Sequence, residues 1–371
     1  MKILVLTNAP APYRMDFFAE LGKKLELTVL IEQSAAEQTH RNPEWFTEYA
    51  HSFETIYLKG IKCGSKKLHP EVVKYLKKKE YDLILVMGYS LPTEILSVIY
   101  LHFKRIPFVL CFDGTVPKQT SAAKNMLKKF LISKASYFLS TGEATDEYIR
   151  GMTGRAENIY RVPFTTLHRE DLPRVLPGAG VKKQYQQKLG LEGRKVILSV
   201  GQFIHRKGYD VLLKAAPKLT DGYEFYIVGD EPTEEYISLK QELGLQNVHF
   251  IGFKKKDELV DYYLAADWFI LPTREDVWAL VIPEAMSYGL PTITTDHCGA
   301  GVELIKPRFP ECIVPIDDVN AIVNAIKMLD QDPQRQAEIS TESFEMMKQY
   351  TMEDMIDRYY QIFSDITARG K

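Results

Sequence analysis

Residues 198–216, "LSVGQFIHRKGYDVLLKAA", run from the end of an apolar strand into a helix. Gly201 permits a tight exit from the strand, and the helical pattern begins near Gly208. Arg206 and Lys207 stand directly before that helix, whose N-terminus offers free N–H groups and a positive dipole end. The stretch predicts a βα unit that either clamps a diphosphate or forms an ordinary charged turn.

Short apolar runs alternate with helical patterns along the rest of the chain. The expected strands are KILVLT, LELTVLIE, YDLILVMG, PFVLCF, YFLS and IYRVPF, and then KVILSVG, EFYIVGD, VHFIGF, WFILPT, LPTITT and ECIVPI. Helical patterns such as MDFFAELGKKL, PEVVKYLKKK and KDELVDYYLAA stand between them. This alternation predicts an α/β fold with parallel sheets covered by helices.

The pattern restarts once, which predicts two doubly wound domains. We place the first at residues 1–168 and the second at 169–349, after which TMEDMIDRYYQIFSDI forms a long amphipathic helix. The LPGAG turn-formers mark a linker at the start of the second domain. Ligands of such sheets bind at the carboxyl ends of the strands, so the loops that leave strands are where a site is expected.

The composition, 45% hydrophobic and 26% charged, is that of a soluble globular protein. No apolar run reaches the roughly 20 residues of a membrane span, and we expect a cytoplasmic protein.

The two halves of the chain differ in charge. Residues 1–170 hold 24 Lys+Arg against 18 Asp+Glu, and the remainder holds 23 against 31. The basic half suits an anionic acceptor or membrane surface, although ordinary scatter explains the difference equally well. Neither a metal-ligand spacing nor the pattern of a nucleic-acid binder is present, so we expect neither partner.

A second stretch, residues 274–293, "REDVWALVIPEAMSYGLPTI", carries two acids with seven residues between them. Pro283 suits the first position of a helix, which puts Glu284 in the first turn. Its carboxylate there either favours the helix dipole or accepts hydrogen bonds from the hydroxyls of a ribose. Asp276 precedes this helix and could hold sugar hydroxyls, with help from the N–H groups of Val277, Trp278 and Ala279.

Together these blocks resemble the retaining glycosyltransferases of family 4, which have the GT-B fold. "D-x7-E-A-M-S-Y-G-L-P" is similar to the family's E-x7-E signature, and "SVGQFIHRKGYDVLLKA" to its diphosphate block. The resemblance covers most of residues 195–363 and is looser before them. It implies two Rossmann-like domains that face a central cleft, with a final helix at about 350–371 that joins the first domain.

The resemblance also implies a role for each matching position. Lys207 would hold the donor diphosphate, Glu284 the ribose and Asp276 the transferred sugar. The donor-binding set is Gly201, Gln202, Phe253, Lys254, Leu259, Val277, Trp278, Ala279 and Glu284. The N-terminal loop with Pro12, Tyr13 and Arg14 would approach the phosphates or the acceptor.

Several positions depart from the family pattern. Asp276 replaces the usual glutamate, Ala279 the usual glycine, and Gln202 the usual clamp arginine, whose charge Arg206 could supply. A histidine expected after the fourth strand of the first domain is missing, and Asp113 stands there instead. Asp113 either orients a sugar hydroxyl or the acceptor, or is a turn residue before a glycine.

The helical pattern at residues 118–134, KQTSAAKNMLKKFLISK, offers two alternatives. Lys124 and Lys128 share one face, and Leu127 and Leu131 another. Such a helix either lies on an anionic membrane or packs on its own sheet with its lysines in water. We expect the second arrangement, with peripheral contact at the inner face of the cell membrane as the alternative.

These observations predict a hexosyltransferase-type enzyme of bacterial surface polysaccharide biosynthesis. It would move a sugar from a nucleotide-diphosphate donor to a saccharide or lipid-linked saccharide. The family resemblance implies that the transfer retains the anomeric configuration and needs no metal or cofactor. Arg206, Lys207, Asp276 and Asp113 are the expected catalytic residues. The alternatives are a sugar-nucleotide epimerase of the same fold and a non-catalytic partner subunit of a glycosyltransferase complex.

Overall fold

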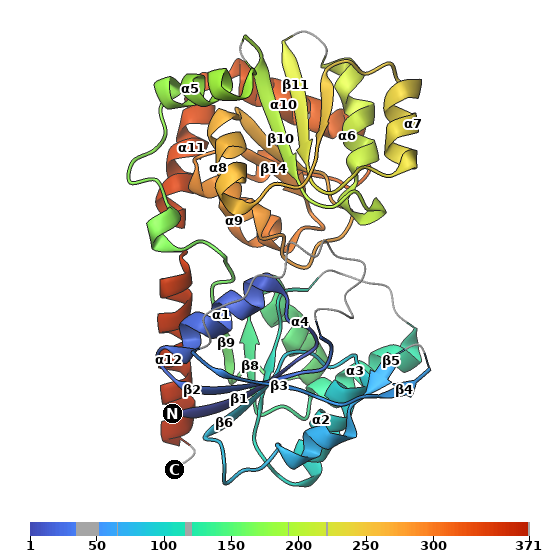
Figure 1. Cartoon of the computed structure of the whole chain (residues 1–371), viewed down its shortest axis with the longest axis vertical. Helices are drawn as coiled ribbons and strands as arrows, with labels where there is room; N and C mark the ends of the chain where they lie inside the picture. Colours follow the sequence, from blue (N-terminus) through green and yellow to red (C-terminus); the bar gives the residue numbers. More distant parts are fainter. Residues whose placement is uncertain (35–51, 65, 116–120, 192, 220–221, 370–371) are drawn as a thin grey trace. The chain divides into compact units, whose positions relative to one another are not determined.

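The computed structural model describes residues 1–34, 52–64, 66–115, 121–191, 193–219 and 222–369. The chain divides into two compact units (Figure 1). Unit 1 comprises Met1–Thr166 and Met352–Lys371, and unit 2 comprises Leu167–Thr351. Each unit has its own parallel sheet, so the α/β class expected from the sequence is confirmed.

Unit 1 has a seven-stranded sheet in the order β3-β2-β1-β6-β7-β8-β9, in which every neighbouring pair is parallel. The strands are β1 Lys2–Thr7, β2 Glu26–Ile31, β3 Glu54–Tyr57, β6 Leu83–Val86, β7 Val109–Cys111, β8 Tyr137–Ser140 and β9 Ile159–Arg161. A separate antiparallel hairpin pairs β4 Ile61–Cys63 with β5 Lys66–Leu68. The hairpin and β3 were not predicted.

Helices cover both faces of this sheet, as the near-continuous apolar strands require. The helices are α1 Pro12–Gly22, α2 Pro92–Phe103, α3 Ala122–Ile132, α4 Glu143–Thr153 and α12 Met352–Arg369. Ile3 and Val5 of β1 belong to the same buried cluster as residues of α1 and α12. Leu4 and Leu6 point to the other face, toward α2, α3 and α4. The alternation along one strand therefore sorts the helices into two layers.

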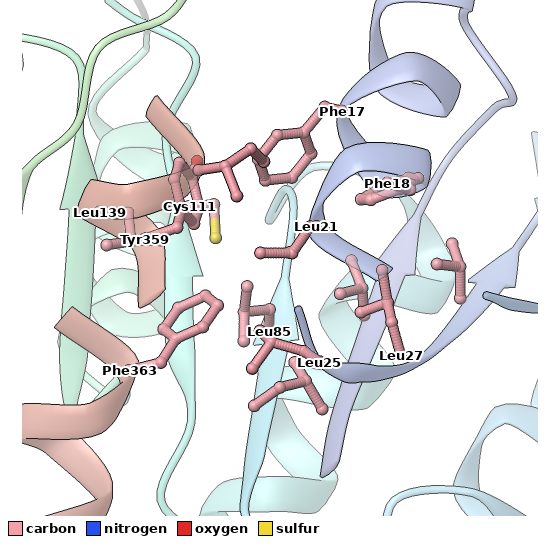
Figure 2. Close-up of a cluster of buried hydrophobic side chains, with 14 of the residues drawn as sticks. Phe17, Phe18, Leu21, Leu25, Leu27, Leu85, Cys111, Leu139, Tyr359 and Phe363 are labelled. Atoms are coloured by element: carbon pink, nitrogen blue, oxygen red, sulfur yellow. The ribbon is translucent and has the colours of Figure 1, made fainter. Parts of the chain in front are cut away.

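The last helix, α12, completes one of these two layers. Phe363 is fully buried, and Tyr359 packs on Phe17 of α1 with ring centroids 4.8 Å apart. Figure 2 shows both aromatic rings of α12 directed toward the side chains of α1 and the sheet. Helix α12 is thus part of the core of the first unit.

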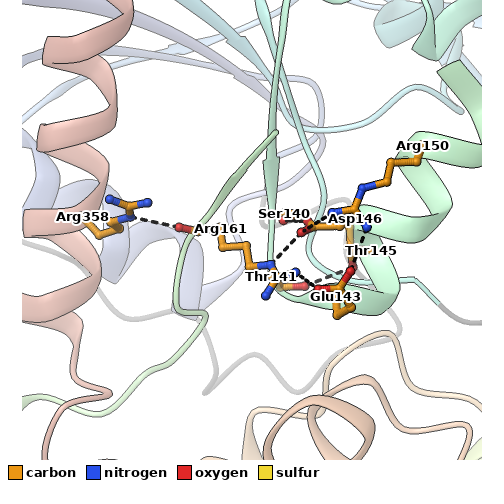
Figure 3. Close-up of polar contacts among 8 residues, drawn as sticks. All are labelled: Ser140, Thr141, Glu143, Thr145, Asp146, Arg150, Arg161 and Arg358. Carbon is orange, nitrogen blue, oxygen red and sulfur yellow. Dashed lines mark hydrogen bonds and ion pairs between the residues drawn. The ribbon is translucent and has the colours of Figure 1, made fainter. Parts of the chain in front are cut away.

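A polar cluster at the ends of β8 and β9 supports the same helix (Figure 3). Arg161 donates from Nε to Asp146 Oδ2 at 2.6 Å and also contacts Glu143. Asp146 accepts a further bond from the Ser140 hydroxyl. Arg358 of α12 donates to the carbonyl oxygen of Arg161 at 3.2 Å. The cluster joins β8, β9, α4 and α12 through charged and backbone groups.

Unit 2 has a six-stranded parallel sheet in the order β12-β11-β10-β13-β14-β15. The strands are β10 Lys195–Val200, β11 Tyr223–Val228, β12 Val248–Ile251, β13 Trp268–Leu271, β14 Thr292–Thr295 and β15 Ile313–Val314. The α-helices are α5 Ala179–Leu189, α6 Tyr209–Ala215, α7 Glu234–Glu242, α8 Lys256–Ala265, α9 Val281–Ser287, α10 Val319–Gln331 and α11 Pro333–Met347. All six strands were predicted, and their carboxyl ends meet at one edge of the sheet.

Short helices fill several connections. They are the 3-10 helices η3 Pro70–Lys74, η4 Arg169–Asp171, η5 His205–Lys207, η6 Ala216–Lys218 and η8 Pro310–Cys312, and the π-helix η7 Gly301–Ile305. The helix expected over PEVVKYLKKK was wrong beyond Lys74, because only η3 forms there and a turn follows. In the described residues, no helix combines the length and the apolar character that crossing a bilayer demands.

Two further expectations were wrong in detail. Pro12, Tyr13 and Arg14 are the first turn of α1 and not a loop, since Pro12 suits the first helical position. Helix α9 begins at Val281, so Pro283 is its third residue, while Glu284 still lies in the first turn.

Candidate active site

The predicted donor-side residues gather where the strands of unit 2 end. Gly201 follows β10, Phe253 follows β12 and Asp276 follows β13. Because β13 neighbours β10 in the sheet, the loop of Asp276 adjoins the loop of Lys207. Strand β12 lies two strands from β10 on the other side, so Phe253 and Lys254 lie farther along the same edge.

Lys207, Asp276 and Arg206 form the centre of the candidate site. Lys207 Nζ lies 2.7 Å and Arg206 Nη1 3.1 Å from the same oxygen of Asp276, Oδ2. Lys207 and Asp276 are only 8% and 9% exposed, whereas the Arg206 side chain is 46% exposed. Burial by itself would raise the pKa of Asp276, but the charges of Lys207 and Arg206 hold it below its ordinary value. The site therefore presents a fixed ion pair beside an exposed cation.

Two glycines allow the loop to place these cations. Gly208 has φ 71°, and a Cβ there would lie 2.0 Å from the carbonyl oxygen of Pro272. Gly201 has φ 151°, and a Cβ there would lie 2.9 Å from the Tyr209 hydroxyl and 3.3 Å from Lys207 Cε. Only glycine tolerates both the dihedral angle and the close approach at Gly208.

Arg274 fixes the same loop, and sequence reasoning missed it. Its Nη1 donates to the carbonyl oxygen of His205 at 2.7 Å, its Nη2 to Asp210 at 2.8 Å and its Nε to Asp317 at 2.7 Å. The hydrogen bond to Asp210 is the main reason why the pKa of Arg274 is raised. These bonds tie η5 and α6 to the segment that carries Asp276. Because the partners lie far apart in the chain, spacing gave no signal for this role.

A backbone bridge holds Asp276 in place. Its N–H donates to the carbonyl oxygen of His297 at 3.0 Å, and its own carbonyl accepts from Gly299 N at 2.9 Å. Ala300 N donates to the carbonyl oxygen of Trp278 at 2.9 Å. A Cβ at Gly299 would lie 2.0 Å from the carbonyl oxygen of Val277, so glycine is required for this contact. The bridge joins residues 297–301, HCGAG, to the loop of Asp276.

The residues after Asp276 differ in exposure. Val277 is 45% exposed, whereas Trp278 is 2% exposed and donates its N–H toward Asp276 Oδ1 at 3.4 Å. Ala279 has φ 71°, in the left-handed region that favours glycine. Ala279 therefore holds a conformation that a glycine, the residue of the family pattern, would adopt without strain.

Glu284 is held by an aromatic pair. Tyr263 of α8 donates its hydroxyl to Glu284 Oε2 at 3.1 Å. Its ring stacks on Tyr288 with centroids 5.4 Å apart and planes 9° apart. Burial, followed by the charge of Glu284, raises the pKa of Tyr263 well above its ordinary value, so the hydroxyl keeps its proton. Tyr263 thus fixes the Glu284 carboxylate, a contact that the sequence did not reveal.

The remaining donor-side predictions have their own partners. Gln202 donates from Nε2 to Asp230 Oδ2 at 3.3 Å, so it is directed toward the end of β11. Lys254 Nζ lies 3.6 Å from Glu258 Oε1, and Leu259 lies in α8. The predicted contact of Phe253, Lys254 and Leu259 with the nucleobase stays a prediction.

Unit 1 brings together two of its predicted residues. Arg14 donates from Nη2 to Asp113 Oδ2, and its Nη1 lies 3.0 Å from Met87 Sδ. Arg14 Nε donates to the Tyr13 hydroxyl at 3.3 Å. Burial would lower the pKa of Arg14, but the charge of Asp113 raises it. Asp113 is thus paired at the carboxyl end of β7, where a ligand of this sheet would bind.

The described residues contain no group of three or more His, Cys, Asp or Glu side chains that could hold a metal ion. The three cysteines described there, Cys111, Cys298 and Cys312, are free and buried. Independence from metal stays a prediction.

Comparison with known proteins connects this geometry to a family. Residues 181–346 match the family profile described as glycosyl transferases group 1. TuaC of Bacillus subtilis, named as a glycosyltransferase of teichuronic acid biosynthesis, is 21% identical over 76% of this chain and 70% of its own length. The lipopolysaccharide glucosyltransferase WaaG of Escherichia coli is 31% identical over 31% of this chain and 32% of its own length. For three further curated relatives, the chain spans 45–53% of their length.

Solved structures agree on the fold. HepE of Anabaena, in complex with UDP and glucose, has a TM-score of 0.76 at 20% identity and covers 98% of this chain and all of its own. The sucrose-phosphate synthase of Thermosynechococcus elongatus has a TM-score of 0.77 at 20% identity, with full coverage of both chains. Residues 181–346 thus form a glycosyl transferases group 1 domain, and the chain as a whole has the GT-B fold of these solved structures.

Proposed function

We propose that the chain transfers a sugar from a nucleotide-diphosphate donor to a hydroxyl of a saccharide or lipid-linked saccharide, with retention of anomeric configuration. The observation that carries the proposal is the cluster of Lys207, Arg206 and Asp276 at the carboxyl edge of the unit 2 sheet. HepE is described in complex with UDP and with UDP-glucose, which supports a nucleotide sugar as donor.

The cations would act on the leaving group. As the bond from the anomeric carbon to the diphosphate breaks, negative charge develops on the phosphate oxygens, where Arg206 and Lys207 would stabilise it. Asp276 holds the Lys207 ammonium in one position, so little reorganisation is needed when that charge develops. A leaving phosphate oxygen would take the proton of the acceptor hydroxyl as the new glycosidic bond forms on the same face.

Glu284 and Asp113 would bind hydroxyl groups on the two substrates. Glu284, oriented by Tyr263, is proposed to accept hydrogen bonds from the ribose of the donor. Asp113, paired with Arg14, is proposed to orient a hydroxyl of the transferred sugar or of the acceptor. We expect turnover to survive chelation by EDTA, because this set uses protein cations alone.

The biological setting is proposed from the relatives. TuaC is named for teichuronic acid biosynthesis and WaaG for lipopolysaccharide, which supports a role in a bacterial surface polysaccharide. An acceptor of that kind, made on the cytoplasmic side, is consistent with a cytoplasmic enzyme in peripheral contact with the membrane.

The first experiment is thermal stability against UDP, GDP, ADP and dTDP, each with matching sugar nucleotides. A ligand at about 100 times its dissociation constant adds roughly 2.7 kcal/mol to the free energy of unfolding. We expect a shift with one base family, and no shift for Glu284→Ala, which should still fold and unfold cooperatively without ligand. Absence of any shift would contradict donor binding and favour the non-catalytic partner subunit. A changed donor released without an acceptor would favour the epimerase.

A further inference from the structure

Large apolar side chains reach the surface of both units. On α3 of unit 1, Met126 and Leu127 are exposed, so the expectation that this helix turns only lysines outward is wrong for Leu127. Among the described residues of unit 2, the exposed large apolar side chains are those of Val175, Val181, Ile204, Val277 and Met328. Val277 differs from the others because it directly follows Asp276, the acid of the candidate site.

The backbone on both sides of Val277 is held in place. Asp276 is bonded to residues 297–301 through its N–H and its carbonyl oxygen. Trp278 is buried, and its carbonyl oxygen accepts a hydrogen bond from Ala300 N at 2.9 Å. The Trp278 N–H also points back to the Asp276 carboxylate, which puts Val277 at the corner of a turn. The isopropyl group of Val277 therefore projects from a loop that is fixed at both ends.

Two backbone donors of this loop have no acceptor in the protein. Among the described residues, the N–H groups of Val277 and Ala279 donate to no oxygen. Ala279 is only 8% exposed, and a backbone N–H in so buried a residue normally has a partner. Unpaired donors next to an exposed apolar side chain indicate a ligand that combines a hydrogen-bond acceptor with an apolar group.

The acceptors of the same loop are already used. Asp276 Oδ2 receives Lys207 and Arg206, and Oδ1 receives the Trp278 N–H. The carbonyl oxygens of Asp276, Trp278 and Ala279 each accept a backbone N–H. A sugar hydroxyl bound here would find donors for its oxygen but a poor choice of acceptors for its proton, whereas a carbonyl group only accepts. The loop therefore suits a carbonyl group better than a hydroxyl group.

We propose that Val277, together with the N–H groups of Val277 and Ala279, recognises an acetamido group on the transferred sugar. The carbonyl oxygen of the acetamido group accepts hydrogen bonds from these N–H groups, and its methyl group packs on the Val277 side chain. The inference rests on the proposed function, since it needs the donor diphosphate at Lys207 and its sugar at the adjoining loop of Asp276. It adds the class of sugar, an acetamido hexose, to that function.

Titration calorimetry of the full chain with pairs of sugar nucleotides tests the proposal. The first pair is UDP-glucose and UDP-N-acetylglucosamine, and the second is UDP-galactose and UDP-N-acetylgalactosamine. The uridine series comes first because HepE is described in complex with UDP and with UDP-glucose. In at least one pair, the acetamido sugar should bind about tenfold more tightly, because a buried methyl group and one further hydrogen bond together contribute about that factor.

Val277→Thr tests the contact with the methyl group. The exchange replaces one methyl group of the side chain by a hydroxyl group and keeps its shape. The preference for the acetamido sugar should fall from about tenfold to about threefold, since the contact between methyl groups is lost. A general disturbance of the loop would weaken both members of a pair equally and leave their ratio unchanged. Val181→Thr, the same exchange at an exposed site of α5, should keep the wild-type preference.

Two results would overturn the inference. The acetamido sugars could bind no more tightly than their hexose counterparts, or Val277→Thr could keep the full preference of wild type. If a base other than uracil stabilises the chain, the hexose and N-acetylhexosamine derivatives of that nucleotide form the decisive pair. A nucleotide that binds without any preference for the acetamido sugar contradicts this inference alone, whereas a chain that binds no nucleotide contradicts the proposed function as well.

Discussion

Ala279 holds a backbone conformation that a side chain rarely adopts. Its φ of 71° costs a residue with a Cβ about 1 to 2 kcal/mol, whereas glycine adopts it freely. We expect Ala279→Gly to raise the free energy of unfolding by up to about 1 kcal/mol, because part of the gain is lost to the entropy of the unfolded chain. Ala337→Gly, at an exposed site within α11, should instead lower it by about 1 kcal/mol. Chemical denaturation of both variants measures the difference, and equal losses would contradict the assigned strain.

Lys207 is predicted to act on the leaving group. Lys207→Ala should lower turnover by roughly 10² or more, the loss that follows removal of one charge-stabilising group. Lys182→Ala, which breaks a 2.7 Å ion pair with Asp267 at the entry to β13, should leave turnover close to wild type. Initial rates at saturating donor test this prediction. A loss of turnover of only a few-fold in Lys207→Ala would refute the role of Lys207 in stabilising the leaving group.

The ion pair also predicts a pH dependence of stability. Asp276 has a lowered pKa in the folded state, so its contribution is present above its unfolded pKa and disappears as pH falls through the folded value. The stability difference between wild type and Lys207→Ala should therefore shrink in acid. Urea unfolding of wild type and Lys207→Ala, at pH 7 and at pH 3, measures this difference in stability.

Glu32 titrates in the opposite sense. It is 4% exposed, its Oε1 has no hydrogen-bond partner among the described residues, and burial followed by the charge of Glu94 raises its pKa to about 8. The folded chain therefore holds this proton where the unfolded chain has lost it, so stability falls as pH rises from about 4.5 to about 8. Glu32→Gln should be about 3 to 5 kcal/mol more stable than wild type at pH 8, and nearly equal at pH 4. The free energy of unfolding of both proteins, measured at pH 8 and at pH 4, tests this pH dependence. A gain in stability of the same size at both pH values would contradict it.

At the scale of elements, α8 positions a group on α9. Tyr263→Phe removes the hydrogen bond to Glu284 and leaves the aromatic stack, so it should raise the KM for donor about three- to tenfold with little change in kcat. Tyr223→Phe loses a comparable bond to Asp330 where β11 begins, and should leave KM unchanged. Equal behaviour of the two variants would mean that Tyr263 only stabilises the fold.

The elements themselves were largely predictable, and their contacts were not. Apolar runs predicted all strands of unit 2, because a parallel strand that is buried on both faces consists of nearly uninterrupted apolar residues. Arg274 was missed because its three partners come from distant segments. The spacing in α3 predicted an amphipathic helix but not which side meets the sheet. Family blocks predicted Lys207 and Asp276 near one another, but not that they share one hydrogen bond.

At the scale of the whole molecule, α12 belongs to unit 1 although unit 2 precedes it in the chain. Phe363→Ala should destabilise unit 1 by about 3 to 5 kcal/mol, because the ring is fully buried. Tyr360→Ala, on the same helix at 43% exposure, should cost about 0.5 kcal/mol or less. Hydrogen exchange resolved by peptide should show the loss in β1, β6 and β7 and not in β10 or β13. Equal loss in both sheets would mean that the units unfold together.

The return of α12 sets the order in which the chain can fold as it is synthesised. Domains usually fold in the order in which they leave the ribosome. Here Phe17 and Phe18 of α1 pack in one layer with Tyr359 of α12. That layer is incomplete until Met352–Arg369 has emerged. Unit 2, complete at Thr351, has all its strands before then. The second unit in the sequence is thus the first that can finish, and the nascent first unit must keep one apolar face uncovered until α12 has emerged.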